Sequence, residues 1–329
     1  MELLLSLLPV TLMLVFFVFL DTFKLIKPAF LLLSIHWGLI ANASSFYSNT
    51  YIFHFLGIDF PIYASFIAPV VEEILKFAYL ILLIKLNKTN FVIDTAIHGF
   101  AIGTGFALME NVFYFINNPG SDIALWMIRG FGTSIMHGGA TAIAGVLIIL
   151  FFTSEKKRYE LLFIGLLIPI IIHAFYNGFY LDPILNTALM ILAIPVLLYF
   201  SFSFSENLLR DSMDMELDTE SVLLSSLNEG KFAATKAGKY LLTVKDQFSP
   251  EVVFDIICFI KLYLELSIKA KGVLLLQESG LPVTKEPATE AKLDEMEYLQ
   301  KNIGPTGMLA IAPIIKFSRK DIWKLKVLE

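Results

Sequence analysis

The sequence has little of what cysteine-based or nucleic-acid-binding proteins need. It contains a single cysteine, Cys258, so disulfide bonds within the chain and cysteine-based metal sites are excluded. Only 17 % of the 329 residues are charged, and the net charge of −5 gives no reason to expect nucleic acid as a partner. Any metal ion must therefore be bound by histidine and carboxylate side chains.

Apolar residues dominate instead. Hydrophobic residues make up 57 % of the chain, and its mean hydropathy is +0.72. These values are typical of a multi-pass membrane protein. The long apolar runs end near residue 205, and charged residues crowd the rest. We therefore predict an all-α membrane helix bundle over 1–204, an acidic linker over 205–230 and a mostly helical cytoplasmic region over 231–329.

The apolar runs are long enough for about seven membrane-spanning helices, since about 20 residues of helix cross a bilayer. Their predicted limits are 3–20, 26–42, 60–84, 91–116, 122–152, 160–181 and 184–204.

The charges of the short loops predict the orientation of these spans. Alternate loops, at 43–59, 117–121 and 181–183, contain no lysine or arginine. The remaining loops carry Lys24, Lys27, Lys85, Lys88, Lys156, Lys157 and Arg158. Because basic loops stay in the cytoplasm, we expect the N-terminus outside and the C-terminus inside, as an odd number of spans requires.

The stretch APVVEEILKF, residues 68–77, places three charges inside a predicted span. Glu72, Glu73 and Lys76 each oppose insertion by about 2.5–3.5 kcal/mol when near a helix centre. Lys76 lies three or four residues from both glutamates and can reach either one. The two glutamates differ by about 100° around the helix, so one can face a cavity while the other pairs with Lys76.

Other predicted spans carry polar groups at compatible depth. Glu110, His137, His173 and Asn177 lie in spans four, five and six, and His173 and Asn177 share a helix face. Counted from the outer end of each span, these residues and Glu72 fall between the outer half and the midplane. We expect them to converge on one buried pocket that opens toward the extracytoplasmic side.

At these residues the sequence resembles the PrsW family of intramembrane proteases, which is related to the type II CAAX prenyl endopeptidases and the bacteriocin-processing membrane proteases. The matching pieces are EEILK (72–76), GFALMEN (105–111), the isolated His137 and HAFYN (173–177). All lie within the predicted motif core, 60–181. The second motif ends in Glu110, where the prenyl endopeptidase branch has histidine.

The resemblance implies an endopeptidase that cuts the extracytoplasmic part of a membrane-anchored protein, such as an anti-sigma factor. It also implies a functional set of Glu72, Glu73, Glu110, His137 and His173, to which helical spacing adds Lys76 and Asn177.

Two water-based mechanisms remain open at this point. In the first, Glu110, His137 and His173 bind Zn²⁺, Glu72 is the general base, and the Glu73–Lys76 pair is a brace. In the second there is no metal: a carboxylate takes the proton of water, and His173 with Asn177 stabilises the oxyanion.

Two other classes of protein also bury such groups. A proton- or cation-coupled transporter places glutamate, lysine and histidine inside spans, but it predicts an internal repeat that is not seen in the sequence. A non-catalytic membrane scaffold could use the same polar cluster to bind a partner helix.

Overall fold

The computed structural model describes residues 2–21, 24–153, 158–283, 286–315, 325, 327 and 328, without the side chains of 206–216. Throughout these ranges the regular structure is helical, which confirms the predicted all-α class. Lys156 and Lys157, which contribute to the predicted orientation, lie outside the described residues. The contacts within the chain divide it into two units, Met1–Glu206 and Asn207–Glu329, each described separately below.

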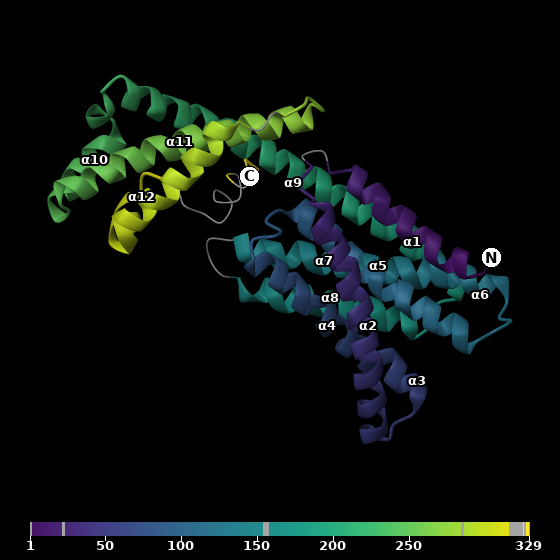
Figure 1. Ribbon diagram of the computed structural model, residues 1–329. Helices are drawn as coiled ribbons and strands as arrows, with labels where there is room; N and C mark the ends of the chain where they lie inside the picture. Colours follow the sequence, from purple (N-terminus) through teal and green to yellow (C-terminus); the bar gives the residue numbers. More distant parts are fainter. Residues whose placement is uncertain are drawn as a thin grey trace. The chain divides into compact units, whose positions relative to one another are not determined.

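The first unit is a bundle of long apolar helices joined by short connections (Figure 1). Its elements are α1 (Glu2–Phe19), α2 (Pro28–Leu56), α3 (Phe60–Ile62), η1 (Tyr63–Ile67), α4 (Ala68–Lys85), α5 (Val92–Asn117), α6 (Ile123–Ile128), η2 (Arg129–Thr133), α7 (Ser134–Thr153), α8 (Tyr159–Asn177) and the first part of α9 (Pro183–Asn228).

Among the described residues, six segments are long and apolar enough to cross a membrane, which confirms a polytopic bundle. The remaining predicted span, 60–84, is divided into α3, η1 and α4 and contains the charges of Glu72, Glu73 and Lys76. The predicted number of seven spans stays a prediction.

Helix α5 forms the centre of this bundle. Its most apolar 18-residue window is 83 % buried, against 22 % for the windows of α1, α2 and α8. It packs against α7, α2 and α1 (Figure 1). Two of its glycines permit close approaches: a Cβ on Gly103 would collide with the carbonyl of His137 on α7, and one on Gly105 with the carbonyl of Ile35 on α2. These contacts fix the depth of His137 against α5.

The second unit has its own apolar core. It contains the end of α9, then η3 (Phe232–Ala234), α10 (Lys236–Val244), η4 (Lys245–Gln247), α11 (Pro250–Glu278) and α12 (Pro287–Ile311). Phe259, Ile260 and Tyr263 of α11 pack there with Leu299 of α12. The hydroxyl of Ser249 accepts a hydrogen bond from the backbone N–H of Val252, as a helix N-cap does.

The predicted division at 204 and 230 differs from the observed helix boundaries. Residues 205–228, predicted as most of an acidic linker, continue α9 without a break as far as Asn228. Helix α12 of the region predicted as mostly helical continues to Ile311 past a break at Gly304 (φ 67°) and Pro305.

Candidate active site

The two adjacent glutamates of α4 have different environments. The Glu73 side chain is 1 % exposed and lies 2.6 Å from Nζ of Lys76, which is fully buried one helical turn later. The Glu72 side chain is 16 % exposed. Glu73 and Lys76 therefore form the internal ion pair, and Glu72 is the accessible carboxylate of α4.

His173 on α8 lies between these two glutamates. Its Nδ1 is 2.9 Å from Oε1 of Glu73, and its Nε2 is 3.7 Å from Oε2 of Glu72. An ionised carboxylate only accepts hydrogen bonds, so Nδ1 of His173 is protonated and donates a hydrogen bond to Glu73. Glu73 therefore fixes the ring of His173 with Nε2 directed at Glu72, as carboxylate partners of metal-binding histidines do.

His137 on α7 connects the same ion pair to a second carboxylate. Its Nδ1 lies 3.0 Å from Nζ of Lys76, and its Nε2 lies 3.0 Å from Oε2 of Glu110 on α5. The ammonium group of Lys76 donates a hydrogen bond to Nδ1. The ring proton of His137 is therefore on Nε2, which donates a hydrogen bond to Glu110. The imidazole is 4.6 Å from that of His173 and almost perpendicular to it. Helices α4, α5, α7 and α8 thus meet in one chain of polar contacts.

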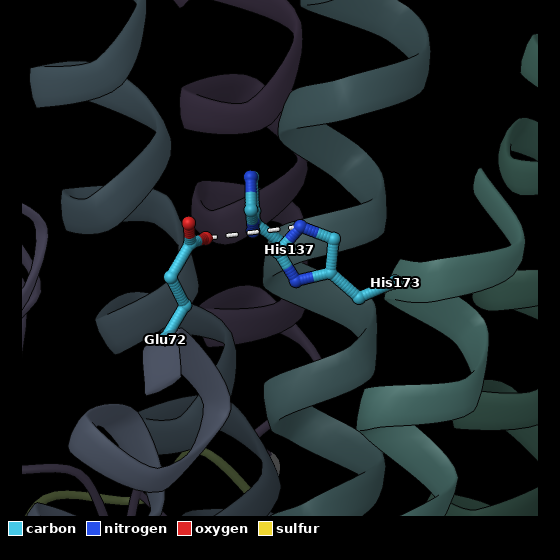
Figure 2. Close-up of side chains that lie close together, drawn as sticks. All are labelled: Glu72, His137 and His173. Carbon is cyan, nitrogen blue, oxygen red and sulfur yellow. Dashed lines mark ion pairs between the residues drawn. The ribbon is translucent and has the colours of Figure 1, made fainter. Parts of the chain in front are cut away.

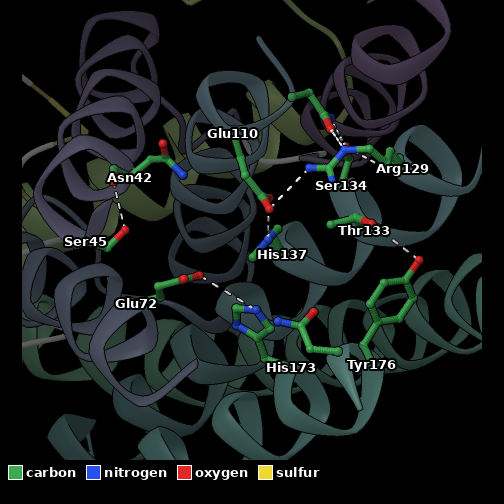
Figure 3. Close-up of polar contacts among 12 residues, drawn as sticks. Asn42, Ser45, Glu72, Glu110, Arg129, Thr133, Ser134, His137, His173 and Tyr176 are labelled. Atoms are coloured by element: carbon green, nitrogen blue, oxygen red, sulfur yellow. Dashed lines mark hydrogen bonds and ion pairs between the residues drawn. The ribbon is translucent and has the colours of Figure 1, made fainter. Parts of the chain in front are cut away.

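Glu110 is the most accessible of these groups, with 34 % of its side chain exposed. Its Oε1 lies 3.2 Å from the guanidinium group of Arg129, in η2. Figure 3 shows the side chain of Arg129 directed at Glu110. Nε of Arg129 donates to Oδ1 of Asn111 at 2.8 Å, and the guanidinium group lies over the ring of Tyr114. Nδ2 of Asn111 in turn donates to Oγ of Ser134 at 2.8 Å. Arg129 therefore compensates the charge of Glu110 from a helix that precedes His137.

Asn177 has a different contact from the one predicted. Its Nδ2 donates to the carbonyl oxygen of Ala64 at 3.3 Å, which ties α8 to η1. The carbonyl is free for this bond because η1 has π-helical spacing, in which Ala64 would pair with the N–H of residue 69. Residue 69 is Pro69, which has no N–H. Asn177 thus braces the segment that leads into Glu72, and its predicted catalytic role stays a prediction.

Sequence reasoning missed two residues of the site. Asn49 donates from Nδ2 to Oε1 of Glu72 at 3.2 Å, and Tyr63 donates from its hydroxyl to Oδ1 of Asn49 at 2.9 Å. Asn49 was missed because the apolar run of the second span ends near residue 42, whereas α2 continues to Leu56. Arg129 was recognisable as a charge within a span, but nothing in its spacing indicates Glu110, 19 residues earlier, as its partner.

One group of described residues could hold a metal ion. Glu72, His137 and His173 each offer a donor atom, and these atoms lie within 4.8 Å of one another (Figure 2). A carboxylate and two imidazoles are a donor set of zinc hydrolases, and the contact of His173 with Glu73 supplies the usual carboxylate partner. The donor set therefore fits a metal ion. The set predicted from the sequence has Glu110 in place of Glu72.

The comparisons with known proteins agree with this chemistry. Residues 27–202 match the family model described as PrsW family intramembrane metalloprotease. No curated protein and no solved structure matches the chain significantly. The matched range covers more than half of the chain and includes every residue of the polar cluster. The chain is therefore a membrane peptidase that belongs to the PrsW family of intramembrane metalloproteases.

Proposed function

We propose that this chain cleaves a peptide bond in the extracytoplasmic part of a membrane-anchored protein, such as an anti-sigma factor. The loop charges support a position in the cell membrane with the N-terminus outside and the C-terminal region in the cytoplasm. In that orientation the outer ends of the predicted spans 60–84 and 160–181 are residues 60 and 181. Glu72 lies about 12 residues and His173 about 8 residues inside these ends, a depth that supports access for a segment that enters from outside.

The grouping of Glu72, His137 and His173 is the observation that carries this proposal. We propose zinc as the metal, held by one oxygen of Glu72 and one nitrogen of each imidazole. A bound zinc ion polarises a carbonyl group and makes water more acidic.

The surrounding residues have distinct roles in this proposal. Glu73 holds His173 through Nδ1, and Lys76 holds both Glu73 and His137. With Glu72 in the metal-binding group, Glu110 is the remaining accessible carboxylate. We assign it the proton of the attacking water, which it then gives to the leaving amine. This assignment exchanges the roles of Glu72 and Glu110 relative to the sequence-based prediction.

The test is cleavage by the full-length protein in detergent, with candidate single-span proteins as substrates. We expect Glu72→Gln and His173→Ala to abolish cleavage while the unfolding temperature stays close to that of the wild type. Glu160→Gln is the matched control, because Glu160 is exposed in the first turn of α8. Retained cleavage in Glu72→Gln, Glu73→Gln and His173→Ala would contradict the proposal.

Removal of the metal tests the role of zinc separately. A strong chelator should abolish cleavage, and zinc added in excess of the chelator should restore it. Cleavage that requires Glu72 but persists in the chelator would instead support the mechanism without metal, in which a carboxylate activates the water.

A further inference from the structure

The accessible carboxylate of α4 is held from a different helix. Nδ2 of Asn49, on α2, donates to Oε1 of Glu72 at 3.2 Å, while Oε2 of Glu72 is the oxygen that lies 3.7 Å from Nε2 of His173. The two oxygens of one carboxylate therefore have different partners. One is occupied by a side-chain amide, and the other faces the imidazole.

The orientation of the Asn49 amide is itself fixed. Its Oδ1 accepts the hydroxyl proton of Tyr63 at 2.9 Å. A reversed amide would direct its oxygen at the carboxylate of Glu72, which has no proton to donate when ionised. Tyr63 is 3 % exposed, and its ring packs edge-on against Phe53, one turn beyond Asn49 on α2. The hydroxyl of Tyr63 thus selects the amide orientation that holds Glu72.

The contrast with Glu73 shows what a neutral partner provides. Glu73 is paired with the ammonium group of Lys76, which compensates its charge. Asn49 contacts Glu72 without compensating its charge, so the carboxylate stays negatively charged and its second oxygen can bind a cation or a proton. Of the two glutamates, only the one held by an amide belongs to the metal-binding group.

We propose that Asn49, oriented by Tyr63, is a positioning residue that holds Oε1 of Glu72 and so directs Oε2 toward His173 and the metal. This inference rests on the proposed function, because it assumes that Glu72 binds zinc. Neither Asn49 nor Tyr63 belongs to the sequence motifs that carry the family resemblance.

The test is the zinc affinity of the full-length protein in detergent, measured by competition with a chromogenic zinc chelator. Asn49→Leu removes the donor but keeps the branched shape of the side chain, and it should weaken zinc binding about 10- to 100-fold, as loss of a residue that orients a ligand does. Tyr63→Phe keeps the ring and should weaken it about 2- to 10-fold. Thr50→Val is the control, because Thr50 is exposed beside Asn49 and its hydroxyl donates to the carbonyl of Phe46 in its own helix.

The double variant Asn49→Leu/Tyr63→Phe separates positioning from general stability. If Tyr63 acts only through Asn49, the double variant binds zinc as Asn49→Leu does, with no further loss. We expect similar unfolding temperatures for the zinc-free wild type and variants. A loss of zinc affinity at equal stability is then due to positioning of Glu72 and not to unfolding.

Three results would overturn the inference. Zinc affinity of Asn49→Leu within twofold of the wild type and of Thr50→Val would show that Asn49 does not position the ligand. Additive losses in the double variant would show that the two residues act separately. Both results would leave the proposed function intact. A wild-type protein that binds no zinc would overturn the proposed zinc site and this inference with it, whereas absence of cleavage by the wild type is what would overturn the proposed peptidase function.

Discussion

At the scale of single residues, the site depends on a difference between two neighbours in the sequence. Glu73 is enclosed by Lys76 and His173, whereas Glu72 is partly exposed and held by Asn49. The sequence predicts that one glutamate pairs with Lys76 and that the other faces a cavity, because they differ by about 100° around the helix. Which one does which depends on the positions of α2 and α8, and these are set by tertiary packing.

The ion pair of Glu73 and Lys76 gives a prediction about stability. Lys76→Met leaves a buried carboxylate without its countercharge and should destabilise the protein by about 3–5 kcal/mol. The double variant Glu73→Gln/Lys76→Met leaves no buried charge at this position and should recover most of that loss. Thermal unfolding in detergent measures both. A double variant no more stable than Lys76→Met would contradict the account.

At the scale of helices, the contacts of α5 set the depth of Glu110 and His137. Gly103 has no side chain where α5 meets the backbone of His137. We expect Gly103→Ala to separate α5 from α7, with a loss of about 1–3 kcal/mol in stability from overpacking. Because Glu110 and His137 lie on those two helices, cleavage should fall as well.

A helical glycine with open space around it provides the control for the overpacking explanation. Gly272 lies in α11, and a Cβ there would meet nothing within 4 Å. Gly272→Ala should leave the protein as stable or slightly more stable, because alanine favours helix over glycine. Equal losses in unfolding temperature for Gly103→Ala and Gly272→Ala would contradict the packing explanation.

The helical class and the motif residues could be predicted from the sequence, but the exact helix boundaries could not. Periodicity and hydropathy predict the helical class, and motif spacing predicts Glu72, His137 and His173 as neighbours, which the structure brings together. Asn49 could not be predicted, since polar residues in 43–59 look like a loop until α2 is seen to continue to Leu56. The contact of Asn177 with Ala64 depends on a π-helical turn, which no simple pattern indicates.

At the scale of the whole molecule, the single cysteine reports on the proposed orientation. Cys258 lies in α11, in the region proposed to be cytoplasmic. A membrane-impermeant thiol reagent should therefore label it in inside-out vesicles and not in intact cells. Burial raises the pKa of the Cys258 thiol, with Asp255 and Glu295 adding to the effect. The thiolate fraction, and hence the labelling rate, should be low at neutral pH and increase as pH rises toward that pKa.

A cysteine introduced on the proposed outer side of the membrane provides the complementary labelling test. Asp59→Cys, placed in the Cys258→Ser background, lies in the exposed turn between α2 and α3, proposed to be outside. It should be labelled in intact cells. Labelling of Cys258 in intact cells, or protection of residue 59 there, would reverse the orientation and place the accessible side of the site in the cytoplasm.

The central claim is that Glu72, and not Glu110, completes the metal site with His137 and His173. The most direct measurement is the zinc content of the purified full-length protein after dialysis, for the wild type, Glu72→Gln and Glu110→Gln. The account predicts about one zinc ion per chain in the wild type and in Glu110→Gln, and a large loss in Glu72→Gln. Full zinc content in Glu72→Gln together with its loss in Glu110→Gln would contradict it.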